Sequence, residues 1–122
     1  MDEKQALMER AHEKLEVTKR LLEEGFYADA VSRAYYAMFY AARALLAERD
    51  LYPKTHRGVI SQFGLIFVKA GQFDREIFDF FVRAQEDREE ADYGVLVEIE
   101  EEEVKELLEG AEDFLRECER ME

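Results

Sequence analysis

The sequence has little of what cross-links or interrupts a chain: it contains one cysteine, one proline and no tryptophan among 122 residues. The lone Cys118 excludes an internal disulfide bond and any metal site built from several cysteines, so a reducing, cytoplasmic compartment is expected. No basic segment followed by an apolar run opens the chain, which argues against a signal peptide. The longest stretch without a charged residue, 58–68, is too short to cross a bilayer, so no membrane span is predicted.

The formal net charge of −13 is unevenly distributed along the chain. Residues 1–70 hold 11 Lys/Arg against 10 Asp/Glu, whereas residues 71–122 hold 6 against 20. Within 33–69 the balance is 6 basic to 2 acidic, so any contact with a polyanion would have to use this central segment. The absence of asparagine, together with many Glu and Arg, is typical of proteins from hot environments.

Four residues, Gly25, Pro53, Gly71 and Gly94, divide the chain, and the long stretches between them show helical periodicity. They predict five helices, at about 2–24, 28–48, 55–70, 74–92 and 98–120. The connections are short, so neighbouring helices should run antiparallel. The sequence therefore predicts an all-α, up-and-down bundle that forms one domain over residues 1–122.

The predicted second helix carries unusual residues on the side where a surface helix normally has simple charges. Its apolar face consists of Val31, Ala34, Tyr35, Met38, Ala42 and Leu45. At about 100° per residue, the opposite side carries Asp29, Arg33, Tyr36, Tyr40 and Arg43. Such a helix either lies at the centre of the bundle or packs against a second subunit. Its tyrosines and arginines then either form a buried hydrogen-bond network or face a ligand or a dimer partner.

The predicted fourth helix places charge on its apolar stripe. Ile77, Phe81 and Ala84 form the stripe, and its next members toward the C-terminus are Arg88 and Asp92. Such an ion pair on the core side stabilises a fold weakly, because both ions lose their hydration. The fixed fork of donors in arginine suits a phosphate or a carboxylate, so Arg88 is a candidate for holding an anion.

The segment Lys54-Thr55-His56-Arg57 opens the predicted third helix. Free backbone N–H groups and the positive end of the helix dipole favour an anion there, and three side chains that can carry positive charge add to this. The segment is therefore either a phosphate-binding corner or an ordinary N-cap with solvated charges.

Metal and familiar hydrolase chemistry are not supported by the sequence. Glu9-x-x-His12 matches one half of a di-iron motif, but a second such pair is missing, so no metal site is predicted. Cys118 lies on the apolar stripe of the last helix and is expected to be a core residue. No glycine-rich phosphate loop or nucleophile elbow is present, and no cofactor is predicted.

Three blocks of the sequence together resemble the HEPN family of small helical proteins. They are 32–42 (SRAYYAMFYAA), 54–58 (KTHRG) and 88–93 (REEADY), and the similarity spans roughly residues 5–118. The resemblance implies an up-and-down four-helix bundle with an additional helix, which pairs into a homodimer. It also implies a minimal nucleotidyltransferase as partner, in a toxin–antitoxin or nucleotide-handling pair.

Some members of this family are metal-independent ribonucleases that use an arginine and a histidine separated by four to six residues. Arg88 matches the arginine, but the position that corresponds to the histidine is Asp92, with three residues between. His56 is then the candidate substitute for acid–base chemistry, provided that the third helix begins close to Arg88. Tyr93 follows Asp92 as a tyrosine follows the motif in some toxin relatives, where the nucleotidyltransferase adenylylates it.

Three hypotheses follow from the residues and the resemblance. The first is a dimeric module that binds a nucleotide or an RNA phosphate with a cleft of Arg88, Asp92, Tyr93, Arg33, Tyr36, Tyr40, Lys54, His56 and Arg57. The second is a metal-independent endoribonuclease toxin that uses Arg88 with Asp92 or His56. The third is a purely structural dimerisation domain, in which the same polar residues hold two subunits together without a ligand.

Overall fold

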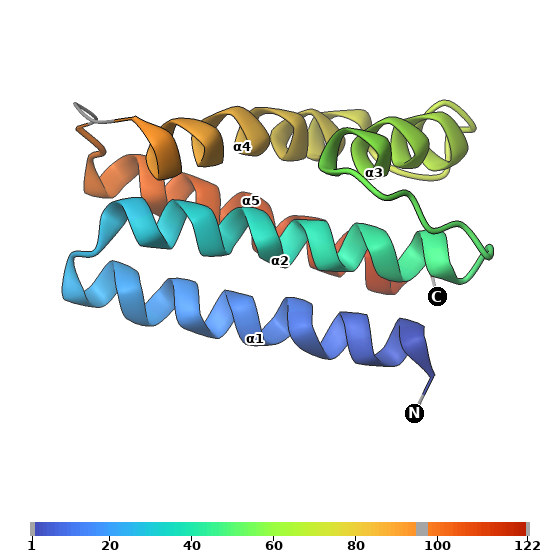
Figure 1. Ribbon diagram of the computed structural model, residues 1–122, viewed down its shortest axis with the longest axis horizontal. Helices are drawn as coiled ribbons and strands as arrows, with labels where there is room; N and C mark the ends of the chain where they lie inside the picture. Colours follow the sequence, from blue (N-terminus) through green and yellow to red (C-terminus); the bar gives the residue numbers. More distant parts are fainter. Residues whose placement is uncertain (1, 95–97, 122) are drawn as a thin grey trace.

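The computed structural model describes residues 2–94 and 98–121, and this part of the chain is helical and without strands (Figure 1). Its elements are α1 (Glu3–Glu24), α2 (Tyr27–Ala47), α3 (His56–Phe63), a π-helical turn η1 (Gly64–Val68), α4 (Arg75–Tyr93) and α5 (Glu101–Arg120). Figure 1 shows α1, α2, α4 and α5 running alternately in opposite directions, with both termini at the same end of the bundle. The short α3 lies beside the last turns of α2. The predicted all-α bundle of four long helices and an additional one is confirmed.

Local signals in the sequence set most of the helix ends. The side chains of Asp2, Thr55 and Asp74 each accept a backbone N–H bond three residues ahead, at 2.8, 2.9 and 3.0 Å. Gly25 ends α1 in the left-handed region, with φ 83° and ψ 14°, where a side chain would be strained. The predicted ends of the first, second and fourth helices are therefore correct to within a residue or two.

Two predicted boundaries differ from the structure. The third helix does not continue regularly to residue 70: it ends at Phe63 and widens into η1, where Gly64 lies against the Phe78 ring. A Cβ at position 64 would come within 2.8 Å of that ring, so the close packing depends on glycine. The last helix begins at Glu101 rather than at residue 98, because Ile99 packs against the core while the chain is still extended at Glu100.

The second helix lies at the centre of the bundle. It packs against α1, α3, α4 and α5. Its buried alanines leave room for these neighbours to approach closely: Ala30, Ala34, Ala37, Ala41, Ala42, Ala44 and Ala47. The sequence pattern of α2 allowed two placements, at the centre of the bundle or against a second subunit. Within the subunit, α2 takes the central one.

An aromatic core joins α3, α4 and α5. The Phe114 ring centroid lies 4.9 Å from that of Phe81, 5.0 Å from that of Phe73 and 5.5 Å from that of Phe63. Phe63, Phe81 and Phe114 are fully buried, and Cys118, one turn beyond Phe114, is buried as predicted. This region is apolar and tightly packed, and it fixes the position of α4 against α3 and α5.

The described ranges 2–94 and 98–121 include no helix that is both long and apolar enough to cross a bilayer. Within the same ranges, no three His, Cys, Asp or Glu side chains gather in a way that could hold a metal ion. His12 instead contacts Glu119, with 3.2 Å between Nε2 and Oε2, and so ties α1 to α5.

Candidate functional site

Arg88 is a buried arginine on the inward stripe of α4, and its residue surface is only 7% exposed. Its Nη1 donates to Oδ2 of Asp92 at 3.3 Å, and its Nη2 donates to Oε1 of Gln85 at 3.4 Å. Its Nε is buried without a hydrogen-bond partner. A buried guanidinium with one unsatisfied donor and two long hydrogen bonds has capacity left to bind an anion.

Two tyrosines of α2 hold the guanidinium of Arg88 by their ring faces. The Arg88 Cζ lies 5.2 Å from the Tyr35 ring centroid and 5.7 Å from that of Tyr36. Burial opposes the charge of Arg88, but Tyr36 and Asp92 outweigh it and raise the pKa of Arg88 above its ordinary value. Arg88 therefore stays charged inside the bundle.

Asp92 connects Arg88 to α2 and to the surface. Its side chain is 30% exposed and also accepts a long hydrogen bond, of 3.5 Å, from the hydroxyl of Ser32. The ion pair of Arg88 and Asp92 therefore lies at the edge of the bundle interior: the guanidinium is buried and the carboxylate reaches solvent. An anion that approaches from solvent would meet Asp92 first and could take its place on the guanidinium.

His56, at the first position of α3, is bound to the same aromatic group. Its Nδ1 lies 2.8 Å from the hydroxyl of Tyr35, and its ring stacks on Phe39 with centroids 4.4 Å apart. Burial, followed by the charges of Arg88 and Arg43, lowers the pKa of His56 below its ordinary value. Burial also raises the pKa of Tyr35. At neutral pH the pair is a neutral imidazole and a protonated phenol.

Arg88 and His56 lie against the same two tyrosines. The His56 ring centroid is 5.7 Å from the centroid of Tyr35 and 5.7 Å from that of Tyr36, the rings that also carry the Arg88 guanidinium. His56 and Arg88 are therefore connected through these two rings, and the charge of Arg88 helps to lower the pKa of His56.

A hollow of about 430 Å³ opens beside this group, between α1, α2 and the end of α4. It is lined by Arg10, Lys14, Asp29, Ser32, Arg33, Tyr36, Tyr40 and Asp92. The Arg10 Cζ lies 4.9 Å from the Tyr40 ring centroid, so α1 adds cations to the polar side of α2. Three cations against two carboxylates make the hollow locally basic in an acidic chain.

The structure brings together some of the predicted site residues and separates others. Those in the group or its hollow are Arg88, Asp92, His56, Arg33, Tyr36 and Tyr40. Lys54 and Arg57 are exposed beside His56 and do not line the hollow. Tyr93 is 76% exposed at the end of α4. In the segment 54–57, therefore, His56 faces the bundle and contacts Tyr35, whereas the other side chains are exposed.

Four residues of the group were not predicted: Tyr35, Ser32, Arg10 and Lys14. Tyr35 lies on the apolar face of α2, as its spacing indicated, but its hydroxyl reaches His56. The rule that a buried phenol needs a partner could have marked it. Arg10 and Lys14 come from α1, and the sequence pattern does not say which side of α1 meets the tyrosines of α2.

Comparison with known proteins yields one family and several relatives. The family model of the HEPN domain matches residues 5–121. A protein of Methanocaldococcus jannaschii named "Putative toxin MJ0142" is 40% identical over 113 residues, which cover 93% of this chain and 77% of that protein. A second from that organism, "Putative toxin MJ0605", is 42% identical over 93% of this chain and 84% of its own length. A "UPF0332 protein" of Thermotoga maritima is 42% identical over 99% of this chain and 95% of its own.

Proposed function

Because the chain belongs to the HEPN domain family, we propose that it is the toxin-type half of a two-protein pair and binds a nucleotide or an RNA phosphate as a homodimer. The names of the two M. jannaschii relatives support the toxin part of this proposal. The locally basic hollow beside Arg88 supports the anion part. The strongly acidic remainder of the chain restricts the contact with a polyanion to this side of the bundle.

The observation that carries the proposal is the state of Arg88. A buried guanidinium costs hydration free energy, which the long hydrogen bonds to Asp92 and Gln85 and two ring faces offset only in part. An entering phosphate oxygen would satisfy the Nε of Arg88 and replace a long bond with a shorter, charge-assisted one. Tyr36 and Tyr40, half-buried along the hollow, offer ring faces for a base.

Thermal unfolding in the presence of ATP, or of a short single-stranded RNA, tests the proposal. Either ligand should raise the melting temperature of the wild-type chain. Arg88→Met should abolish the rise, and Arg88→Lys should reduce it, because lysine keeps the charge but loses the fork of donors. Arg75→Met, at an exposed arginine at the start of α4, is the matched control and should keep the rise. Equal shifts in all four proteins would refute an anion site at Arg88.

The proposed partner is a minimal nucleotidyltransferase, and the proposed target on this chain is Tyr93. Its phenol is 76% exposed and follows Asp92 directly, so a second enzyme can reach it without unfolding α4. Such an enzyme would transfer the adenylyl group of ATP to the Tyr93 hydroxyl and release pyrophosphate. Co-expression with it should therefore add one or more adenylyl groups to the chain, and Tyr93→Phe should prevent this. Sedimentation of the isolated chain tests the homodimer.

A metal-independent endoribonuclease is the second candidate, and the position of His56 favours it. His56 contacts the tyrosines that hold Arg88, and its imidazole is neutral, as a general base must be. Cleavage of RNA in the presence of EDTA, and none of the corresponding DNA, would support this candidate. His56→Gln should then remove cleavage while the ligand-dependent rise in melting temperature persists. If the chain binds RNA without cleaving it, the endoribonuclease is excluded and the binding module is the remaining proposal.

A further inference from the structure

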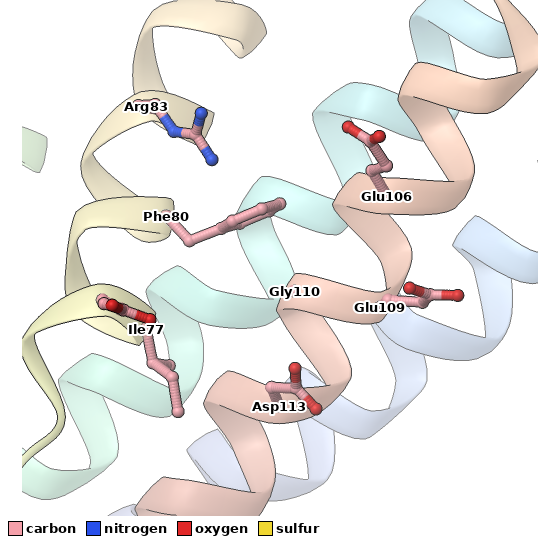
Figure 2. A pocket seen from close by; sticks show the side chains of 8 residues that line it. Ile77, Phe80, Arg83, Glu106, Glu109, Gly110 and Asp113 are labelled. Carbon is pink, nitrogen blue, oxygen red and sulfur yellow. The ribbon is translucent and has the colours of Figure 1, made fainter.

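The seam between α4 and α5 is a second hollowed surface, separate from the Arg88 side. A hollow of about 390 Å³ opens there, and Figure 2 shows the Phe80 side chain extending from α4 toward Gly110 of α5. A Cβ at position 110 would overlap the Phe80 ring. Glycine therefore lets an aromatic ring lie across the seam, where it forms part of an apolar floor together with Ile77.

This hollow continues along the seam. A second hollow shares Phe80, Arg83 and Glu106 with the first, and a third shares Asp87, Glu103 and Leu107 with the second. We call the continuous surface the α4–α5 groove. On α4 it extends from residue 76 to residue 90, which corresponds to about 21 Å of helix. A helix of four turns has about this length. Ile77 and Phe80, which line the groove, are partly buried against the core.

The rims of the groove carry an excess of negative charge that the chain itself does not neutralise. Arg83 is the one Lys or Arg among the described residues that line the three hollows. Its Cζ lies over the Phe80 ring, 5.0 Å from the ring centroid. Asp113 pairs with Arg116, but in the described part of the chain Glu76, Glu106 and Glu109 have no ion pair. Burial, followed by the carboxylates of Glu103 and Glu86, raises the pKa of Asp87 even though Arg83 acts in the opposite direction. The carboxylates of the groove repel one another, and a cationic occupant would relieve this repulsion.

We propose that the α4–α5 groove binds a basic amphipathic helix of a partner protein. The apolar stripe of that helix would lie on Phe80 and Ile77, and its Lys and Arg side chains would meet the carboxylates of the two rims. Charge complementarity selects this occupant: a nucleic acid or an anionic membrane would be repelled by the same rims. The groove does not depend on the Arg88 site, so either proposal can fail alone.

Two synthetic peptides of identical Lys/Leu composition test the proposal by fluorescence anisotropy. In the first, leucines at helical spacing form one stripe; in the second, they are scattered around the helix. The wild-type chain should bind the striped peptide at least several-fold more tightly, because only that peptide can use the apolar floor. Equal affinity for both peptides would reduce the interaction to general charge attraction and overturn the proposal.

Two sets of variants locate the binding. Glu86→Lys with Glu106→Lys reverses the charge of one exposed side chain on each rim. This double change should lower the affinity for the striped peptide by roughly tenfold or more. Glu23→Lys with Glu24→Lys makes the same change in net charge at the exposed end of α1, and should have an effect of less than about twofold. Phe80→Ala should remove the preference for the striped peptide. Equal weakening by both charge reversals, or an unchanged preference in Phe80→Ala, would refute the groove as the binding site.

Discussion

The two halves of α4 present opposite chemistry to the interior. The first half packs Phe78, Phe81 and Ala84 into an aromatic core that contains Phe114. The second half continues the same stripe with the charged Arg88. The first arrangement is what burial of apolar surface produces, whereas the second has a cost in hydration. Burial of apolar surface alone does not account for an arginine at this position, and the proposed anion site rests on it.

The largest effect is expected where the apolar half is disrupted. Phe114→Ala removes a fully buried ring that contacts three other phenylalanines, and should lower the free energy of unfolding by about 3–5 kcal/mol. Urea unfolding followed by circular dichroism measures this loss. A loss below about 1 kcal/mol would mean that the aromatic core relaxes around the cavity, and the contrast between the two halves would disappear.

An intermediate effect is expected when the second half of α4 loses one member of the ion pair between Arg88 and Asp92. Asp92→Ala leaves the buried guanidinium of Arg88 without its carboxylate, and should lower the free energy of unfolding by about 1–3 kcal/mol. Arg88→Met removes the buried charge itself and should cost less than about 1 kcal/mol, since methionine fills similar space without a hydration penalty. The same urea titrations compare the two. If Arg88→Met were the more costly change, Arg88 would have a structural role.

A smaller effect concerns pH and His56. Burial and the nearby charges of Arg88 and Arg43 lower the pKa of His56 in the folded chain, so the unfolded chain takes up the proton first as the pH falls. The contribution of His56 to stability is therefore complete above its unfolded pKa and declines as the pH falls below it. NMR titration of the ring should give a higher pKa in Arg88→Met than in the wild-type chain. An unchanged value would place the Arg88 charge too far away to assist His56.

The sequence predicted the helices, apart from two of their boundaries, but it did not predict how the helices are oriented relative to one another. Glycines such as Gly25 marked ends of helices, and the stripe of α4 singled out Arg88, because both features are local in the chain. The hydrogen bond between Tyr35 and His56 joins α2 to α3, and the stacking of Arg10 on Tyr40 joins α1 to α2. Such contacts depend on how each helix is rotated about its axis, which hydrophobic spacing fixes only to within a broad face.

The smallest effect is expected at the margin of the apolar region, in the α4–α5 groove. Gly110→Ala should gain up to about 1 kcal/mol of helix propensity in the middle of α5. The new methyl group must also displace the Phe80 ring, which is only half-buried and can move. These two terms should nearly cancel, so we expect the free energy of unfolding to change by less than about 0.5 kcal/mol.

The cancellation can be resolved with a double-mutant cycle. When Phe80→Ala has already removed the ring, adding Gly110→Ala should stabilise the chain by most of the roughly 1 kcal/mol that the helix gains. The difference between the two backgrounds is the cost of moving Phe80, and it measures how firmly the ring is held across the seam. If Gly110→Ala stabilises both backgrounds equally, the ring is loosely held and the apolar floor of the groove is not preformed.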